Sequence, residues 1–192
     1  MNEIRKFRWS LMPVLAKRSG AGYIGRTALM KYMYFLQTIK DVPLGYDFSL
    51  YSYGPFDSEV LADLSSAEAL KIVDVDTVAF SGGYGYKIQP GSCATASENE
   101  ASHLLDKHKK DIDWLFSVFG SLNSSELELV STIVYADREN AEASTRMSIA
   151  EVTIRVNEIK PRFSREQIQK FVMDLLQKGV LIATVAGDAP RQ

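Results

Sequence analysis

Hydrophobic residues recur at helical spacing through the first forty residues. The stripe in residues 3–18 consists of Ile4, Phe7, Leu11, Val14 and Leu15. This spacing predicts a helix over 3–18 that kinks or ends early at Pro13, because proline cannot donate the backbone hydrogen bond of a helix interior. A second stripe predicts a helix over 27–38 with Thr27 as its N-cap.

The pattern changes to strict alternation in the next segment, GYDFSLYSYGPFD, residues 45–57. A period of two predicts a strand over 46–53. One face would hold Tyr46, Phe48, Leu50 and Ser52, and the other would hold Asp47, Ser49, Tyr51 and Tyr53. After Gly54-Pro55, a helix is predicted over 58–70, with Asp57 and Glu59 capping its first turn.

Two further apolar runs, 72–80 and 84–88, surround Ser81-Gly82-Gly83 and predict a β-hairpin with a glycine turn. Helices, a short strand, a helix and a terminal hairpin follow one another in the order of a winged helix, in which the hairpin is the wing. We therefore expect a mainly α fold, with a winged-helix-like part over 1–92.

The rest of the chain reads as helical. Residues 90–100 are small and polar and predict a linker, and apolar spacing predicts one helix over 98–119. Capping boxes are expected at three later helix starts: Ser125 with Glu128, Ser148 with Glu151, and Ser164 with Gln167. Gly179 fits the C′ position of the last helix. These elements predict a C-terminal helical bundle over 97–186, packed with the first part into one compact unit.

Composition narrows the class of protein. The 192 residues are 46% hydrophobic and 24% charged, which is ordinary for a globular protein. No apolar run is long enough to span a bilayer, and the first fifteen residues lack the pattern of a secretory signal. A single cysteine, Cys93, cannot form an internal disulfide, so a reducing cytoplasm is the expected location.

The net charge of −2 conceals two segments of opposite sign. Residues 1–40 contain eight Lys/Arg and one Asp/Glu, whereas residues 41–100 contain two Lys/Arg and ten Asp/Glu. Either the basic segment binds an anionic partner such as nucleic acid, or the two segments pack together and neutralise each other. The sequence leaves both interpretations open.

Enzyme chemistry finds little support in the sequence. The two histidines, His103 and His108, are five residues apart, lie on different faces of the predicted helix and are expected on the surface. Lysines beside His108 disfavour a metal site, and no phosphate-binding loop follows a strand. We expect no catalytic residue, no metal and no cofactor.

The Gly54-Pro55 turn is the strongest candidate for a binding site. Asp57 and Glu59 already supply negative charge to the helix that follows, so a phosphate is disfavoured there and a protein partner is favoured. Tyr51 and Tyr53 are the expected anchors, since aromatic rings offer a large contact area at a low cost in conformational entropy. Three acidic residues, Asp47, Asp57 and Glu59, would select a basic partner.

A winged-helix DNA-binding regulator is the alternative. The helix over 58–70, in the place of a recognition helix, offers Glu59, Asp63 and Glu68 but no basic side chain. DNA contact would therefore fall to other basic residues. These are Arg5, Lys6 and Arg8 in the first helix, or Arg155, Lys160, Arg162 and Arg165 around the last turn. The segment LLQKGVLI also resembles the end of a recognition helix that enters a strand.

Three quoted segments resemble a known family: LMKYMYFLQ, LGYDFSLYSYGPFDSEVLADL, and LKIVD with the Gly-Tyr hairpin. They resemble the YwgA-like prokaryotic proteins and are more distantly similar to the Panacea domain of SocA-like antitoxins. The resemblance covers about residues 25–90. It implies a small helical protein with winged-helix-like features and no known catalysis, which binds a protein partner as an antitoxin or an adaptor.

Overall fold

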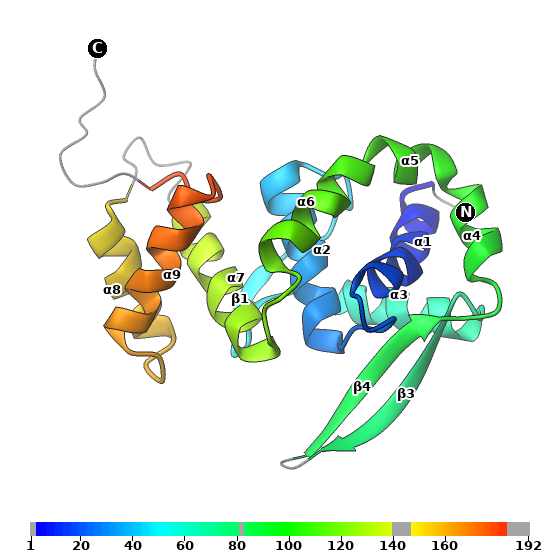
Figure 1. Cartoon of the computed structure of the whole chain (residues 1–192), viewed down its shortest axis with the longest axis horizontal. Coiled ribbons are helices and arrows are strands. Elements are labelled where there is room, and N and C mark those ends of the chain that lie inside the picture. The colour runs from blue at the N-terminus through cyan, green and yellow to red at the C-terminus, as the bar shows by residue number, and fades with distance from the viewer. Residues whose placement is uncertain (1–2, 81–82, 140–146, 184–192) are drawn as a thin grey trace. The chain divides into compact units, whose positions relative to one another are not determined.

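The computed structural model describes residues 3–80, 83–139 and 147–183. The protein is mainly helical, with two small antiparallel two-stranded sheets in the described part (Figure 1). It divides into two compact units. Unit 1 comprises Met1–Ser49 and Phe56–Ser124, and unit 2 comprises Leu50–Pro55 and Ser125–Gln192. Within the described residues no helix is long and apolar enough to cross a membrane.

The helices of unit 1 are α1 Glu3–Arg18, α2 Arg26–Lys40, α3 Ser58–Ala69, α4 Ala94–Glu100, α5 Ser102–Lys107 and α6 Lys109–Phe119. The core forms where the apolar stripes of α1 and α2 meet the later helices. Phe7, Leu11 and Leu15 of α1 are fully buried, and the ring of Phe35 in α2 stacks on Phe119 with centroids 4.1 Å apart. Burial is wider than the predicted stripes: residues 7–13 of α1 and 29–36 of α2 are buried without interruption, whereas Val14 of the predicted stripe is half-buried.

Two details of these helices differ from the prediction. α1 continues to Arg18 through Pro13, which is buried, so the early end predicted at Pro13 is wrong. The packing of a buried face stabilises the helix on both sides of the missing hydrogen bond. α2 begins at Arg26 with Gly25 as its N-cap, so the assignment of Thr27 as the cap is also wrong.

The alternating segment forms two short strands rather than one. β1 is Ser49–Tyr51 and β2 is Gly54–Phe56, because the chain turns at Ser52-Tyr53 where a strand over 46–53 was predicted. The two predicted faces nevertheless differ in burial. Tyr46 is buried and Phe48 is half-buried, whereas Tyr51 and Tyr53 are exposed. Ser52, predicted on the same face as Tyr46, is exposed because it lies in the turn.

The predicted hairpin is confirmed. β3 Val73–Phe80 pairs antiparallel with β4 Gly83–Pro90, in a register that places Val75 opposite Ile88. The turn residues 81–82 lie outside the described residues. Near its base Val73 and Ile88 are buried, and Ile88 also bridges to Ile24. Toward its tip the hairpin projects from the helices of unit 1, and Tyr84 is 77% exposed (Figure 1).

The predicted linker over 90–100 is wrong, because most of it forms α4. This helix packs on α1 through its polar residues, with Ser97 Oγ 2.6 Å from Ser10 Oγ and Glu98 Oε1 2.6 Å from Lys17 Nζ. The predicted helix over 98–119 is broken at Ala101 and His108 into separate helices. After α6, the boundary between the two compact units lies at Ser124–Ser125.

Unit 2 contains α7 Ser124–Glu139, α8 Ile149–Ile159 and α9 Arg165–Gln177. Capping boxes begin α8 at Ser148 and α9 at Ser164, as predicted. The box predicted at Ser125 is wrong, because α7 already begins at Ser124 and Glu128 is buried in ion pairs. Gly179, with φ +67°, ends α9 as expected.

The chain after α9 is fixed to α7 by polar contacts. The Asp137 carboxylate accepts the backbone N–H of Ile182 at 3.0 Å and that of Ala183 at 2.8 Å. Arg138 donates to the Val180 carbonyl at 2.9 Å. Val152 and Val156 of α8, Ile168 and Val172 of α9, and Val180 are fully buried in unit 2. Unit 2 thus has a buried core of its own.

Candidate functional site

The tyrosine loop, residues 50–55, presents two aromatic side chains to solvent. Tyr51 is 68% exposed and Tyr53 is 71% exposed. Most large apolar side chains in the described residues are buried, and the exposed tyrosines lie mainly in this loop and on the β3–β4 hairpin, which carries Tyr84 and Tyr86. The sequence assigned the rings of Tyr51 and Tyr53 to the outward face, and the structure places them there.

Contacts within unit 2 fix the backbone of this loop. Gly54 has φ +84°, a region that favours glycine, and a Cβ at this position would lie 3.0 Å from both Ser131 Oγ and Thr132 Oγ1 of α7. The loop therefore approaches α7 as closely as only glycine allows. Lys160 Nζ donates a hydrogen bond to the Ser52 carbonyl oxygen from the end of α8. These contacts explain why Gly-Pro follows the tyrosines: it packs the loop on α7.

A charged cluster lies beneath the loop and is called here the Glu128 cluster: Glu128, Lys160 and Arg162. The buried Glu128 carboxylate accepts from Lys160 Nζ at 2.7 Å and from Arg162 Nη2 at 2.7 Å. The Lys160 side chain is 5% exposed, whereas that of Arg162 is 53% exposed. Two cations share one carboxylate, so the cluster has a surplus positive charge, and the exposed Arg162 brings that charge to the surface.

A small cleft joins the loop to this cluster. Its volume is about 230 Å³ and it is lined by Ser52, Tyr53, Glu128, Ile159, Lys160, Pro161 and Arg162. Sites for drug-sized ligands usually enclose about 300–1,000 Å³. The cleft is therefore suited to one inserted side chain of a partner rather than to a metabolite.

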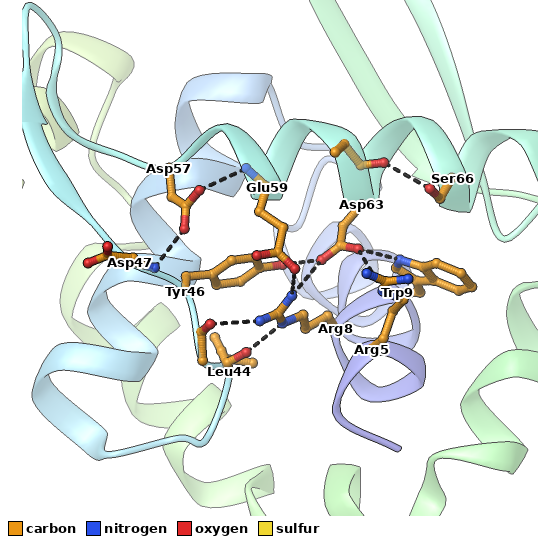
Figure 2. A network of polar contacts seen from close by, with 12 residues as sticks. Arg5, Arg8, Trp9, Leu44, Tyr46, Asp47, Asp57, Glu59, Asp63 and Ser66 are labelled. Carbon is orange, nitrogen blue, oxygen red and sulfur yellow. Dashed lines mark hydrogen bonds and ion pairs between the residues drawn. The ribbon is translucent and has the colours of Figure 1, made fainter. Parts of the chain in front are cut away.

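The three acidic residues of the predicted surface belong to unit 1 (Figure 2). Asp57 caps α3 as predicted, accepting the Glu59 N–H at 2.8 Å, and it also accepts the Asp47 N–H at 2.6 Å. Glu59 forms an ion pair with Arg8. Two of the three carboxylates thus have structural roles in unit 1, while the two tyrosines belong to unit 2.

Arg8 is the centre of a polar network in unit 1 that also includes Trp9, Tyr46, Glu59 and Asp63 (Figure 2). The buried Asp63 carboxylate accepts from Trp9 Nε1 at 2.8 Å, from Tyr46 Oη at 3.0 Å and from Arg8 Nη1 at 3.2 Å. Arg8 also donates to the carbonyls of Leu44 and Gly45, and its guanidinium lies 4.0 Å from the centre of the Tyr46 ring. We call this group the Arg8 network.

The surroundings of the Arg8 network raise the pKa of two of its members, Tyr46 and Arg8. Burial, together with the charge of Asp63, raises the pKa of Tyr46, so its hydroxyl remains a donor. Burial alone would lower the pKa of Arg8, but the hydrogen bond to Glu59 and the charges around it raise that pKa overall. Tyr46 therefore stays protonated and neutral, and Arg8 stays charged.

These contacts change the interpretation of the basic N-terminal segment. Arg8 is buried, so the prediction that it contacts nucleic acid is wrong. Lys6 is paired with Glu100 at 2.9 Å, and Arg5 is half exposed with Nε 4.0 Å from Asp63. Of the two interpretations left open by the sequence, packing of the basic segment on the acidic segment is confirmed.

His108 is not the surface residue that was predicted. Its ring is buried near Phe7, and Nδ1 lies 2.9 Å from Asp111 Oδ2. His103 is exposed, as expected. In the described ranges, no group of three His, Cys, Asp or Glu residues is placed to hold a metal ion.

Sequence reasoning missed the Glu128 cluster. Glu128 matched a capping-box pattern, whereas Lys160 and Arg162 were considered only as surface cations. The signal in the sequence was that Glu128 is the only charged residue in LELVSTIV, residues 127–134. The structure buries all eight of these residues, so the carboxylate needs a cationic partner.

Comparison with known protein-family models and with curated proteins finds no match for this chain.

Proposed function

We propose that this chain is a non-catalytic protein-interaction module that binds its partner through the tyrosine loop. The observation that carries the proposal is the exposure of Tyr51 and Tyr53 on a backbone held against α7. Preorganised aromatic side chains are common energetic anchors of protein interfaces, because little conformational freedom is lost when they are covered. The adjacent cleft offers a place for one side chain of the partner.

The fold supports a finer description of the same proposal. In unit 1, α1, α2 and α3 precede the β3–β4 hairpin, which is the order of a winged helix with its wing. α3 has no basic side chain, and Asp63 and Glu59 of this helix join the Arg8 network. We therefore assign the winged-helix-like part a role in protein binding, antitoxin-like or adaptor-like, in the cytoplasm. This matches what the resemblance to YwgA-like and Panacea proteins implies.

The chemistry of the partner follows from the charges available. Selection of a basic partner by Asp47, Asp57 and Glu59 remains a proposal for unit 1, although Glu59 is already paired with Arg8. Beside Tyr53 the accessible charge is instead that of Arg162. A partner that fills the cleft is therefore expected to place an acidic or neutral side chain there.

Capture of a defined partner tests the proposal, with the product of an adjacent gene as the probe. Tyr53→Ala should weaken capture at least about ten-fold, and Tyr51→Ala by a smaller factor. Tyr84→Ala is the matched control, since Tyr84 is 77% exposed but lies on the β3–β4 hairpin. Circular dichroism should show that all three variants are folded. Equal capture by parent and Tyr53→Ala chains would reject the proposal.

A further inference from the structure

α8 and α9 form a helix-turn-helix within unit 2. α8 ends at Ile159, residues 160–164 make the turn, and α9 begins at Arg165 and packs on α8 (Figure 1). Asn157 links the two helices: its amide donates to the Phe163 carbonyl at 3.0 Å, and its oxygen accepts from Arg165 Nε at 3.2 Å. The start of α9 is thus held in a defined position.

The end of α9 is fixed as well. Val180 N–H donates to the Leu175 carbonyl at 2.9 Å beyond the Gly179 turn, and the following residues bind Asp137 of α7. A helix held at both ends can present one face to a partner at little further cost in conformational entropy.

The exposed face of α9 has the chemistry of a DNA-reading surface. Ile168, Val172 and Leu175 are buried against unit 2. The exposed positions are Arg165, Glu166, Gln167, Gln169, Lys170, Met173 and Gln177. Arginine, lysine and glutamine side chains are the groups that pair with base edges in the major groove. This face contrasts with α3, whose exposed and half-buried positions carry no basic residue.

The charge around α9 matches a polyanion. Residues 160–178 contain five Lys/Arg and two Asp/Glu, in a chain whose net charge is −2. One of the two acids, Asp174, is paired with Lys178 at 2.7 Å. The other, Glu166, is next to Arg165 and offsets its charge. The expected phosphate contacts are therefore those of Arg162 and Lys170. In helix-turn-helix proteins the second helix enters the major groove with its N-terminal residues at the base edges.

We propose that unit 2 binds double-stranded DNA with α9 in the major groove. Arg165 and Gln169 face base edges, and Arg162 and Lys170 contact phosphates. A-form RNA is disfavoured because its major groove is too narrow for a helix. This function is distinct from partner binding by the tyrosine loop, although Arg162 also lines the cleft beside Tyr53. One chain can carry both, as a regulator whose DNA binding is coupled to a protein partner.

Fluorescence anisotropy of the full chain with a 20-base-pair duplex of mixed sequence tests this inference at about 50 mM salt, where non-specific binding is measurable. The triple variant Arg162→Ala/Arg165→Ala/Lys170→Ala should lose at least about ten-fold in affinity. Its dependence of log affinity on log salt should become shallower by roughly 2, because two phosphate contacts are lost. The control Lys107→Ala/Lys109→Ala/Lys110→Ala makes the same change in net charge on exposed residues of unit 1.

Two results would overturn the inference. Equal losses in the α9 triple variant and the control variant would show that only net charge matters. The second is a parent chain that fails to bind the duplex and yet binds an acidic peptide that the α9 triple variant no longer binds. That pair of results would assign α9 to a protein partner instead. Tyr53→Ala should leave duplex binding unchanged, so failure of the DNA inference and failure of the protein-binding proposal can be told apart. Selection from a random duplex pool should further show that Gln169→Ala alters the enriched sequence.

Discussion

The Arg8 network of unit 1 and the Glu128 cluster of unit 2 both neutralise a buried carboxylate, but they differ in the ratio of carboxylates to cations. Each buries a carboxylate and compensates it with cations. In the Arg8 network, the Arg8 guanidinium serves two carboxylates, Arg5 approaches Asp63 at 4.0 Å, and the remaining acceptor capacity of Asp63 is used by Trp9 and Tyr46. In the Glu128 cluster, one carboxylate serves two cations, and one of these is half exposed.

The difference separates a structural role from a functional one. Both carboxylate oxygens of Asp63 accept hydrogen bonds from residues of unit 1. We therefore assign the Arg8 network a role in stabilising unit 1 rather than in binding a ligand. Arg162 lines an open cleft beside Tyr53, so the Glu128 cluster can both anchor the tyrosine loop and meet a partner. The following variants test this contrast, from the largest expected effect to the smallest.

Asp63→Ala should be the most damaging substitution. It leaves Arg8 with a weaker set of acceptors and removes the acceptor of Trp9 Nε1 and Tyr46 Oη, all in a buried site. Breaking a buried ion pair from one side typically costs about 3–5 kcal/mol. Urea unfolding measures the loss. Ser65→Ala on the exposed side of α3 is the control and should stay within about 0.5 kcal/mol. A loss below about 1 kcal/mol for Asp63→Ala would contradict the structural role of the network.

Glu128→Ala should destabilise the chain less, by about 2–3 kcal/mol. Lys160 would remain buried but keeps its hydrogen bond to the Ser52 carbonyl, and Arg162 can turn into solvent. Arg162→Ala is the companion variant and should cost at most about 1 kcal/mol, as for an exposed ion pair. An equal loss of unfolding free energy for Arg162→Ala and Glu128→Ala would show that Arg162 is held in the cluster and is not available to a partner.

Gly54→Ala should cost about 1–3 kcal/mol, since a residue with a Cβ is strained at φ +84° and meets α7. Gly22→Ala is the matched control, with φ +75° but no atom within 4 Å of the added Cβ. Thermal unfolding of the two variants separates backbone strain, common to both, from the contact with Ser131 and Thr132. Equal losses would show that the tyrosine loop is not packed tightly on α7.

Ser148→Ala should have the smallest effect, about 1 kcal/mol, which is typical for loss of an N-cap serine. Hydrogen bonds from the Ser148 backbone and side chain lower the pKa of Glu151. Stabilisation from this carboxylate is thus present above the ordinary pKa of a glutamate and is lost as the pH falls through the lowered value. The stability difference between parent and variant should shrink in acid, as followed by unfolding across a pH series. A difference independent of pH would rule out a contribution from the Glu151 carboxylate.

Local patterns carried most of the successful predictions. The β3–β4 hairpin, the Asp57 cap of α3 and the boxes at Ser148 and Ser164 depend on residues close together in the sequence. Alternation also separated the buried Tyr46 from the exposed Tyr51 and Tyr53. In each case a short spacing determines which backbone or face a side chain can reach.

Contacts between distant residues account for what was missed. Arg8 meets Glu59 across 51 positions, and Lys160 meets Glu128 across 32. The spacing of Ser125 and Glu128 suits a cap equally well, and only tertiary packing makes Glu128 a buried anion. Likewise, the small polar residues of α4 resemble a linker until Ser10, Lys6 and Lys17 of α1 pair with them.

Site-specific photo-crosslinking tests most directly whether the tyrosine loop is the contact surface. A photoreactive phenylalanine analogue would replace Tyr53 in one chain and Tyr84 in another, both exposed and each in a different unit. We predict one discrete protein adduct from position 53 in cells that produce the chain, identified by mass spectrometry and absent from position 84. The same adducts from both positions, or none from position 53, would contradict the proposal that this loop binds a protein partner.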